Sequence, residues 1–139
     1  DADDGLQCAV YRVLDMSHPQ RLALLQYLFG IAEADGHVDP SERRLLQTIA
    51  TYLGISGKTF GSHEAMYDRK PTRESDYKIL EITASATDVE VKKAYRRMAK
   101  KYHPDKVSTL GDEFQKAAKE KFQRVQQAYD NICKSRGMN

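Results

Sequence analysis

Apolar residues recur along most of the chain at intervals of three and four positions, which is the spacing of a helix with one buried face. No segment shows the regular alternation of apolar and polar residues that is typical of a half-buried strand. The predicted helices cover residues 1–14, 19–34, 40–53, 57–66, 76–82, 88–102 and 112–136. The pattern therefore predicts an all-α protein.

Residues with strong preferences for helix ends separate the second predicted helix from the third. Gly36 suits the left-handed position that follows a helix, because glycine adopts it at little cost. Asp39 suits the N-cap of the next helix, Pro40 its first position and Glu42 its third. Val38 is expected to pin the two helices together. This connection is thus predicted to be short and tightly capped.

The second and third predicted helices each carry a stripe of apolar residues that we expect to face the core. The second helix is so apolar that we expect it to lie at the centre of the first half of the chain. Its inward residues are Leu22, Leu25, Leu28, Phe29 and Ala32, and those of the third helix are Leu45, Leu46, Ile49, Ala50 and Leu53.

The predicted helix over residues 88–102 divides into a basic face and an apolar face. Thr87 suits its N-cap and Glu90 its third position. At about 100° per residue, the two kinds of side chain fall on opposite halves of the helix. The basic half holds Lys92, Lys93, Arg96, Arg97, Lys100 and Lys101, and the apolar half holds Val91, Ala94, Tyr95, Met98, Ala99 and Tyr102. Taken alone, this pattern is typical of a solvated charged face on an ordinary core helix.

The tripeptide His103-Pro104-Asp105 ends this helix. A residue before proline is pushed away from helical backbone angles, and proline lacks the N–H that would extend the helix. Asp105 is therefore expected to present its carboxylate on a stiff turn beside the positive charges. After a loop that reaches Gly111, the helix over residues 112–136 is expected to pack antiparallel to the basic helix, with the tripeptide at the tip.

This arrangement resembles the J-domain, the module that defines DnaJ-type co-chaperones. The resemblance covers Asp76 to Lys134 and implies a short first helix followed by an antiparallel helical hairpin. Glu81 departs from many J-domains, which have glycine at this position, so we expect the first turn to differ in shape. The matching motifs are Tyr77, Leu80 and Ile82, the run Val91-Lys-Lys-Ala-Tyr-Arg-Arg-Met-Ala99, His103-Pro104-Asp105, and Phe122 with Ala128-Tyr129.

The resemblance implies that the chain acts by binding. A DnaJ-type co-chaperone recruits a DnaK-type chaperone and stimulates its ATPase, so ATP belongs to the partner and no cofactor is expected on this chain. Asp105 is expected to pair with an arginine of the partner. Tyr95 fits equally well as a tyrosine at the edge of the core. The partner contacts that the resemblance implies are His103, Pro104, Asp105, Lys92, Tyr95, Arg96, Arg97 and Lys106.

The first half of the chain resembles the TerB-like helical domain over about Gln20 to Met66, in its Ala-Asp-Gly turn and its Asp-Pro-Ser-Glu cap. This stretch is short for a complete domain of that kind and fits a partial bundle. We predict a TerB-like domain over residues 1–66, a polar linker over 67–75 that permits independent motion, and a J-domain over 76–139. This order resembles the DjlA subgroup of DnaJ-type proteins.

Length and composition narrow the possible locations. The 139 residues are 40% hydrophobic and 30% charged, with a formal net charge of +2, which is typical of a soluble globular protein. No apolar run reaches the roughly 20 residues that a membrane helix needs. We expect a cytoplasmic protein, or one at the cytoplasmic face of the inner membrane if an anchor precedes this chain.

Cys8 and Cys133 are expected to be reduced thiols, because neither belongs to a Cys-x-x-Cys pair.

Two other functions, nucleic-acid binding and catalysis, fit the sequence less well. The cations of the basic helix could follow the phosphates of a nucleic acid. The low net charge and the flanking Asp88, Glu90 and Asp105 argue against this, so no nucleic acid is expected. Catalysis is not expected either, because the histidines do not form a His-Glu-x-x-His pattern and no phosphate-binding glycine loop is present.

The first half could instead be a targeting module or a metal-binding module. Asp35, Asp39 and Glu42 are the candidate metal ligands, and Gly36 and Glu42 have the six-residue separation of a calcium-binding loop. The first ligand position of such a loop would be Ile31, which cannot coordinate a metal. Helix capping is therefore the better interpretation of this turn, and no metal is expected.

Overall fold

The computed structural model describes residues 15–34, 36, 38–67 and 72–138, and this part contains helices, turns and loops but no strand. The predicted all-α fold is confirmed. The predicted helix over residues 1–14 lies outside the described residues, as does Cys8, whereas Cys133 is a half-buried free thiol. The helices are α2 (His18–Glu33), α3 (Pro40–Tyr52), α4 (Gly57–Ala65), α5 (Arg73–Ile79), α6 (Asp88–Lys101), the 3-10 helix η1 (Pro104–Val107) and α7 (Asp112–Arg136).

The helix ends follow from the capping residues that the sequence supplies. Asp39 accepts a hydrogen bond from the backbone N–H of Glu42 at 2.9 Å, at the start of α3. Thr87 accepts one from the backbone N–H of Glu90 at 3.2 Å, at the start of α6. Gly137, with a φ of +71°, takes the left-handed conformation that closes α7. These predicted ends are confirmed.

Two segments near the predicted connections differ from the prediction. α5 begins at Arg73 instead of Asp76, because Thr72 and Ser75 form a capping box there. It also ends earlier, at Ile79 instead of Ile82, because Glu81 takes a left-handed conformation with a φ of +61°. The chain after His103 forms the short helix η1 before the loop that leads to α7. The His-Pro-Asp turn is therefore part of a regular 3-10 turn.

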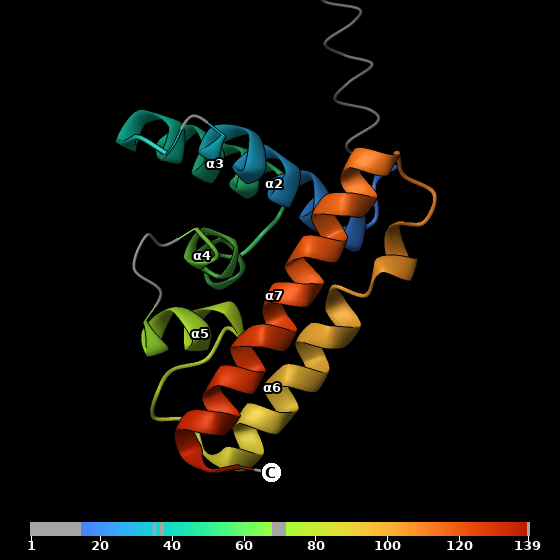
Figure 1. Ribbon diagram of the computed structural model, residues 1–139. Coiled ribbons are helices and arrows are strands. Elements are labelled where there is room, and N and C mark those ends of the chain that lie inside the picture. The colour runs from blue at the N-terminus through green and yellow to red at the C-terminus, as the bar shows by residue number, and fades with distance from the viewer. Residues whose placement is uncertain (1–14, 35, 37, 68–71, 139) are drawn as a thin grey trace, which may run out of the picture.

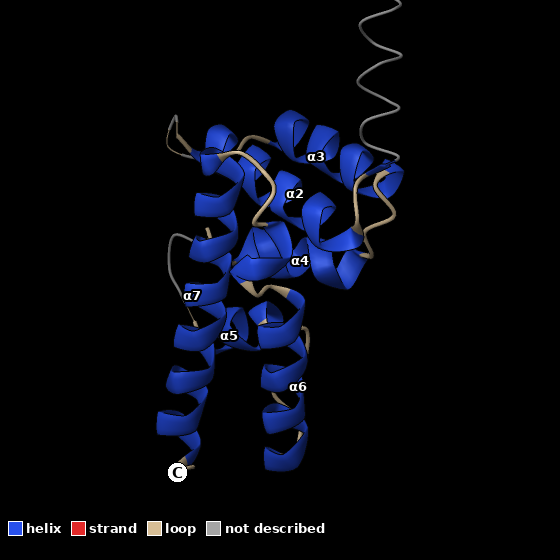
Figure 2. Cartoon of the chain, turned by 90° about the vertical axis from the view of Figure 1, so that its right-hand side faces the viewer, coloured by secondary structure: helices blue, strands red, loops and turns tan. Residues whose placement is uncertain are grey.

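α6 and α7 form an antiparallel hairpin with η1 at the turn between them (Figure 1). α2 packs against the first half of α7, where the rings of Tyr27 and Phe114 lie 4.9 Å apart between centroids. α5 packs against the second half of α7, where Arg124 lies 3.3 Å from Asp76. α4 lies between α2 and α5 (Figure 2). The described part of the first half, from residue 15 to residue 67, therefore lies alongside the hairpin that forms most of the second half.

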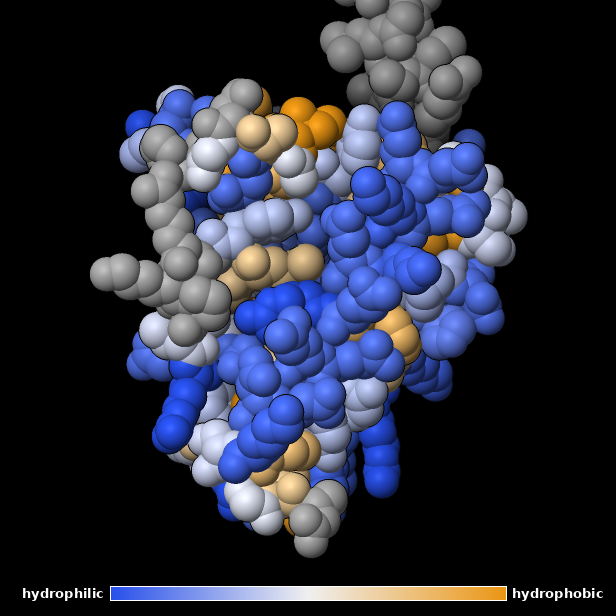
Figure 3. Space-filling model, in the orientation of Figure 1, coloured by the Kyte–Doolittle hydropathy of each residue, from blue (hydrophilic) through white to orange (hydrophobic). Residues whose placement is uncertain are grey.

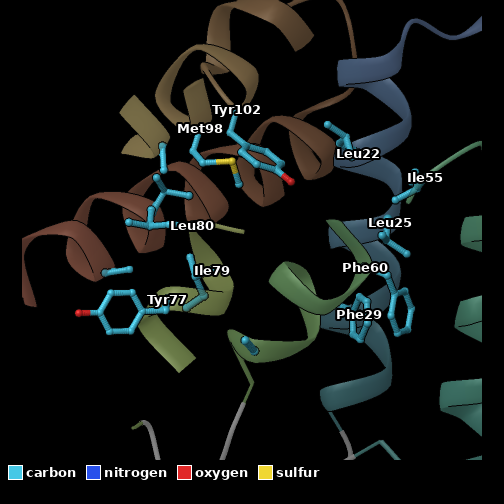
Figure 4. Packing of buried hydrophobic residues seen from close by; sticks show 14 of the residues in the cluster. Leu22, Leu25, Phe29, Ile55, Phe60, Tyr77, Ile79, Leu80, Met98 and Tyr102 are labelled. Carbon is cyan, nitrogen blue, oxygen red and sulfur yellow. The ribbon is translucent and has the colours of Figure 1, made fainter. Parts of the chain in front are cut away.

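One hydrophobic core extends through both halves (Figure 4). Leu25, Phe29 and Phe60 of the first half belong to it, together with Leu80 and Met98 of the second half, and none of these five residues is more than 4% exposed. The halves are thus joined by buried apolar surface as well as by the segment that we predict to be a linker. The domain boundaries themselves stay a prediction.

The prediction that Leu45 faces the core is wrong. Leu45 is 61% exposed, whereas Leu46 is 5% exposed and Ala50 is 2% exposed. Successive residues of a helix differ in direction by about 100°, so a helix that buries a narrow stripe at Leu46 and Ala50 turns Leu45 toward solvent. Leu45 is therefore expected to contribute little to stability.

Hydrophilic residues cover most of the face shown in Figure 3, including the part formed by α7. The large apolar residues that are exposed within the described ranges are Ile31, Leu45, Tyr52 and Val89, which lie on α2, α3 and α6. None of the described helices combines the length and the apolar character needed to cross a membrane.

Candidate functional site

α6 presents a row of cations to solvent. Val91, Ala94 and Met98 are at most 1% exposed, and their burial fixes the rotation of the helix against the core. The side that points away from the core is therefore positively charged, as predicted. We call this surface the basic face, and its exposed members are Lys92, Lys93, Arg96, Arg97 and Lys100.

Lys101 does not belong to the basic face, contrary to the prediction. Its side chain is 22% exposed, and its Nζ lies 2.9 Å from Oε2 of Glu81 and 3.0 Å from Oγ1 of Thr59. Glu81 has a φ of +61°, a left-handed conformation that favours glycine. The Glu81 carboxylate pairs with Lys101 and accepts a hydrogen bond from the hydroxyl of Thr59 at 3.2 Å, and these contacts help to hold the glycine-like turn with a glutamate in place.

Tyr95 lies at the edge of the basic face, with one side of its ring covered. The ring stacks on Tyr129 of α7, with centroids 4.2 Å apart and planes 15° apart, and Tyr95 is half-buried. The stacking gives Tyr95 a packing role between α6 and α7. A contact between its remaining surface and a partner stays a prediction.

The His-Pro-Asp turn lies at the carboxyl end of the basic face. The backbone N–H of Asp105 donates to Nδ1 of His103 at 3.2 Å, and the His103 ring packs edge-on against Phe122 with centroids 5.6 Å apart. Pro104 occupies the first position of η1 and is half-buried. The side chains of His103 and Asp105 are 50% and 91% exposed, and Lys106 is also exposed. The turn therefore offers an imidazole and a carboxylate to solvent.

The predicted contact residues consequently lie along one helix and the turn that follows it. Lys92 stands roughly 16 Å along the helix axis from His103, at about 1.5 Å per residue. The role of each of these residues stays a prediction.

A buried polar network that the sequence pattern does not predict lies next to the turn. His63 of α4 is 0% exposed, with its Nδ1 2.7 Å from Oε1 of Gln26 and its Nε2 3.1 Å from the hydroxyl of Tyr102. Burial, and then the charges of two nearby lysines, hold the pKa of His63 well below its usual value of 6.5. His63 is therefore neutral near pH 7.

Lys121 of α7 is also fully buried, at 0% exposure. Its Nζ donates to Oγ of Ser62 at 2.6 Å and lies 5.1 Å from the centre of the Tyr102 ring. Burial lowers its pKa well below 10.5. The sequence does contain a sign of this burial. Lys121 lies four residues from both Ala117 and Val125, which places it on the apolar stripe of α7.

We expect acid to destabilise the fold through His63. The unfolded chain protonates this histidine near its usual pKa of 6.5, whereas burial keeps it neutral in the fold at much lower pH. The contribution of His63 to the free energy of unfolding is thus complete above pH 6.5. It is lost as the pH falls below that value, by up to about 1.4 kcal/mol per pH unit. Urea unfolding from about pH 7.5 to about pH 5 measures this loss.

The variant His63→Gln isolates this contribution, because its side chain does not titrate. Burial also lowers the pKa values of His18 and Lys121, so these two groups also make the free energy of unfolding fall as the pH falls. They do so in the variant and in the unsubstituted chain alike, and the difference between the two proteins therefore reports His63. The pKa of Asp39 is held at about 2, mainly by the backbone N–H of Glu42, so this group titrates below the range measured. Stability curves that run parallel for the variant and the unsubstituted chain would contradict the prediction.

The alternative metal site has no assembled ligand set in the part of the chain that the structure describes. No group of three or more histidine, cysteine, aspartate or glutamate side chains in that part could hold a metal ion. Oδ1 of Asp39 accepts instead from the backbone N–H of Glu42 and from the hydroxyl of Ser41, at 2.9 and 2.7 Å. Asp35 lies outside the described residues. Helix capping thus accounts for the position of the Asp39 carboxylate.

Several curated relatives share the name co-chaperone protein DjlA. The protein of Shewanella oneidensis is 36% identical over 120 residues, which cover 77% of this chain and 46% of the relative. The protein of Vibrio vulnificus is 37% identical over 154 residues, covering 84% of this chain and 54% of the relative. The protein of Vibrio parahaemolyticus is 32% identical over 171 residues, covering 99% of this chain and 60% of the relative. The chain therefore spans about half the length of these relatives.

Two protein-family models match the chain, whereas no solved structure gives a significant match. Residues 75–136 match the DnaJ domain, and residues 5–65 match tellurite resistance protein TerB. Both resemblances predicted from the sequence are confirmed. The DnaJ match contains the basic face and the His-Pro-Asp turn, and the TerB match precedes it, so residues 75–136 resemble the DnaJ domain and the chain as a whole resembles the DjlA co-chaperones.

Proposed function

We propose that this chain is a co-chaperone that recruits a DnaK-type chaperone and stimulates its ATPase. The observation that carries the proposal is the exposed carboxylate of Asp105, which the turn holds directly after the basic face. The relatives named co-chaperones support it. The partner binds and hydrolyses ATP, and this chain contributes contacts.

The charges suit such a role. The basic face would meet an acidic patch on the chaperone, and charge attraction of this kind raises the rate of encounter. Asp105 would then pair with an arginine near the ATPase domain, in a charge-assisted hydrogen bond. His103 and Pro104 would set the geometry of the turn that presents it.

The described part of the first half, from residue 15 to residue 67, leaves this surface open. Arg96, Arg97 and Asp105 are exposed with α2, α3 and α4 in place. This supports a targeting or self-association role for the TerB-like half over one that blocks access to the J-domain. The proposed location is the cytoplasm, or the cytoplasmic face of the inner membrane if an anchor precedes this chain.

Addition of the chain is expected to raise single-turnover ATP hydrolysis by a DnaK-type chaperone, with an apparent affinity that weakens steeply with salt. Exposed charges are screened within about 8 Å at physiological ionic strength, so attraction through the basic face fades as salt rises from about 50 to 300 mM. At low salt, Arg97→Glu is expected to raise the half-saturating concentration about tenfold. Titration of the chain against a fixed amount of chaperone measures both effects.

Arg44→Glu provides the matched control, because it makes the same change at an exposed position of α3, away from the basic face. This variant is expected to stay within about twofold of the unsubstituted chain. A salt-independent response would exclude the basic face as the docking surface. Failure of the unsubstituted chain to stimulate hydrolysis would refute the proposed function.

A further inference from the structure

The His-Pro-Asp turn is anchored to the first half of the chain on both of its sides. Directly before the turn, the hydroxyl of Tyr102 lies 3.1 Å from Nε2 of His63 on α4. Directly after the turn, Val107 packs in a small apolar cluster with Ala23 of α2. The segment between these two anchors is limited to residues 103–106.

The first anchor is directional, because the network fixes the role of each polar atom. Gln26 donates from Nε2 to the hydroxyl of Tyr67 at 2.6 Å, so its Oε1 is the acceptor that faces Nδ1 of His63 at 2.7 Å. Nδ1 of the neutral ring therefore carries the proton, and Nε2 accepts from the Tyr102 hydroxyl. Gln26, His63 and Tyr102 are 1%, 0% and 6% exposed, so water does not replace a lost bond easily.

The second anchor is apolar. Val107, Ala23 and Ala118 are 2%, 4% and 7% exposed, and they bring η1, α2 and α7 together. Close by, Nε2 of Gln20 on α2 donates to the hydroxyl of Thr109 at 3.4 Å. The first half thus contacts the chain on the far side of the turn through both a side-chain cluster and a hydrogen bond.

Few contacts inside the turn direct the carboxylate of Asp105. The backbone N–H of Asp105 donates to Nδ1 of His103 at 3.2 Å, and that of Lys106 donates to the His103 carbonyl at 3.1 Å. The Asp105 side chain itself is 91% exposed. Its direction therefore follows the backbone, and the two anchors hold the backbone.

We propose that α2 and α4 hold the His-Pro-Asp turn in the orientation that Asp105 needs, with His63 as a positioning residue. This inference rests on the proposed function for its consequence in the partner's ATPase. The rigidity of the turn can be measured in the chain alone. The TerB-like half thereby acts on the J-domain as a support for its contact loop.

Tyr102→Phe and Tyr67→Phe form a matched pair for the test. Each removes one hydroxyl from the same buried network, but only Tyr102 adjoins the turn. NMR relaxation order parameters of the Asp105 and Lys106 backbone N–H groups are expected to fall from about 0.85 to below about 0.6 in Tyr102→Phe. His63→Leu is expected to cause the same fall, whereas Tyr67→Phe leaves the values unchanged.

Order parameters report fast motion in the folded state, so a loss of global stability alone does not change them. The inference is overturned if the turn is already mobile in the unsubstituted chain, or if it stays rigid in Tyr102→Phe. It is also overturned if both tyrosine variants loosen the turn equally, because the effect would then not be specific to the anchor.

Hydrolysis by the chaperone gives the second readout. Tyr102→Phe is expected to lower the maximal stimulation about tenfold and to keep the half-saturating concentration within about twofold, since the basic face is unchanged. Full maximal stimulation by this variant overturns the positioning role. If the unsubstituted chain gives no stimulation, the proposed function fails, and the order parameters still decide whether the first half holds the turn.

Discussion

Asp105→Asn is expected to abolish stimulation of the chaperone ATPase and to leave the stability of the chain almost unchanged. The Asp105 side chain is 91% exposed, and its Oδ2 lies 3.6 Å from Nδ1 of a His103 that is itself half exposed. An exposed pair of this kind contributes little to folding, whereas loss of the charge would remove the charge-assisted bond that we propose to the partner. Single-turnover hydrolysis is expected to return to the rate of the chaperone alone, a loss of at least about tenfold. The Tm is expected to change by less than about 2 °C.

Asp130→Asn is the matched control, because it removes the same charge from an exposed position of α7. This variant is expected to stimulate hydrolysis normally. His103→Gln is expected to lose stimulation as well, with a small loss of stability, because His103 also contacts Phe122 and accepts from the Asp105 N–H. Normal stimulation by Asp105→Asn would show that the carboxylate is not the contact group.

Local chemistry made the turn and the basic face predictable. Pro104 ends α6 through its own ring geometry, and Thr87 begins the helix through a bond to a residue three positions away. The separation of cations from apolar residues depends on helix geometry alone, so five of the six predicted cations lie where the pattern places them. These features need no knowledge of the rest of the fold.

The contacts between the two halves were not predictable in the same way, because they join residues far apart in the chain. His63 meets a glutamine 37 positions earlier and a tyrosine 39 positions later, and no spacing rule connects such residues. Lys101 does not lie on the basic face because it forms an ion pair with Glu81, which takes a left-handed backbone conformation. Leu45 was misplaced because the width of a buried stripe depends on the neighbouring helices, which the sequence of one helix does not specify.

Leu25→Ala is expected to destabilise both halves of the chain together, by about 2–5 kcal/mol. Leu25 of α2 is 0% exposed and belongs to the core that also contains Met98 and Val125 of the hairpin. Because one core is shared, loss of packing in the first half lowers the free energy of opening of α7 as well as that of α2. Hydrogen exchange of backbone amides measures this, since the slowest amides of both helices are expected to lose the same protection.

Leu45→Ala is the matched control, because it makes the same chemical change at a residue that is 61% exposed. It therefore measures the effect of the change on helix propensity without the loss of a buried side chain. Its cost is expected to stay within about 0.5 kcal/mol. If Leu25→Ala weakened protection in α2 and left Val125 and Ala128 of α7 unchanged, the halves would open independently and the buried surface between them would carry little free energy. Equal losses in both helices would instead mean that the J-domain hairpin depends on the TerB-like half for its stability, which is the condition under which α2 and α4 can control the turn that carries Asp105.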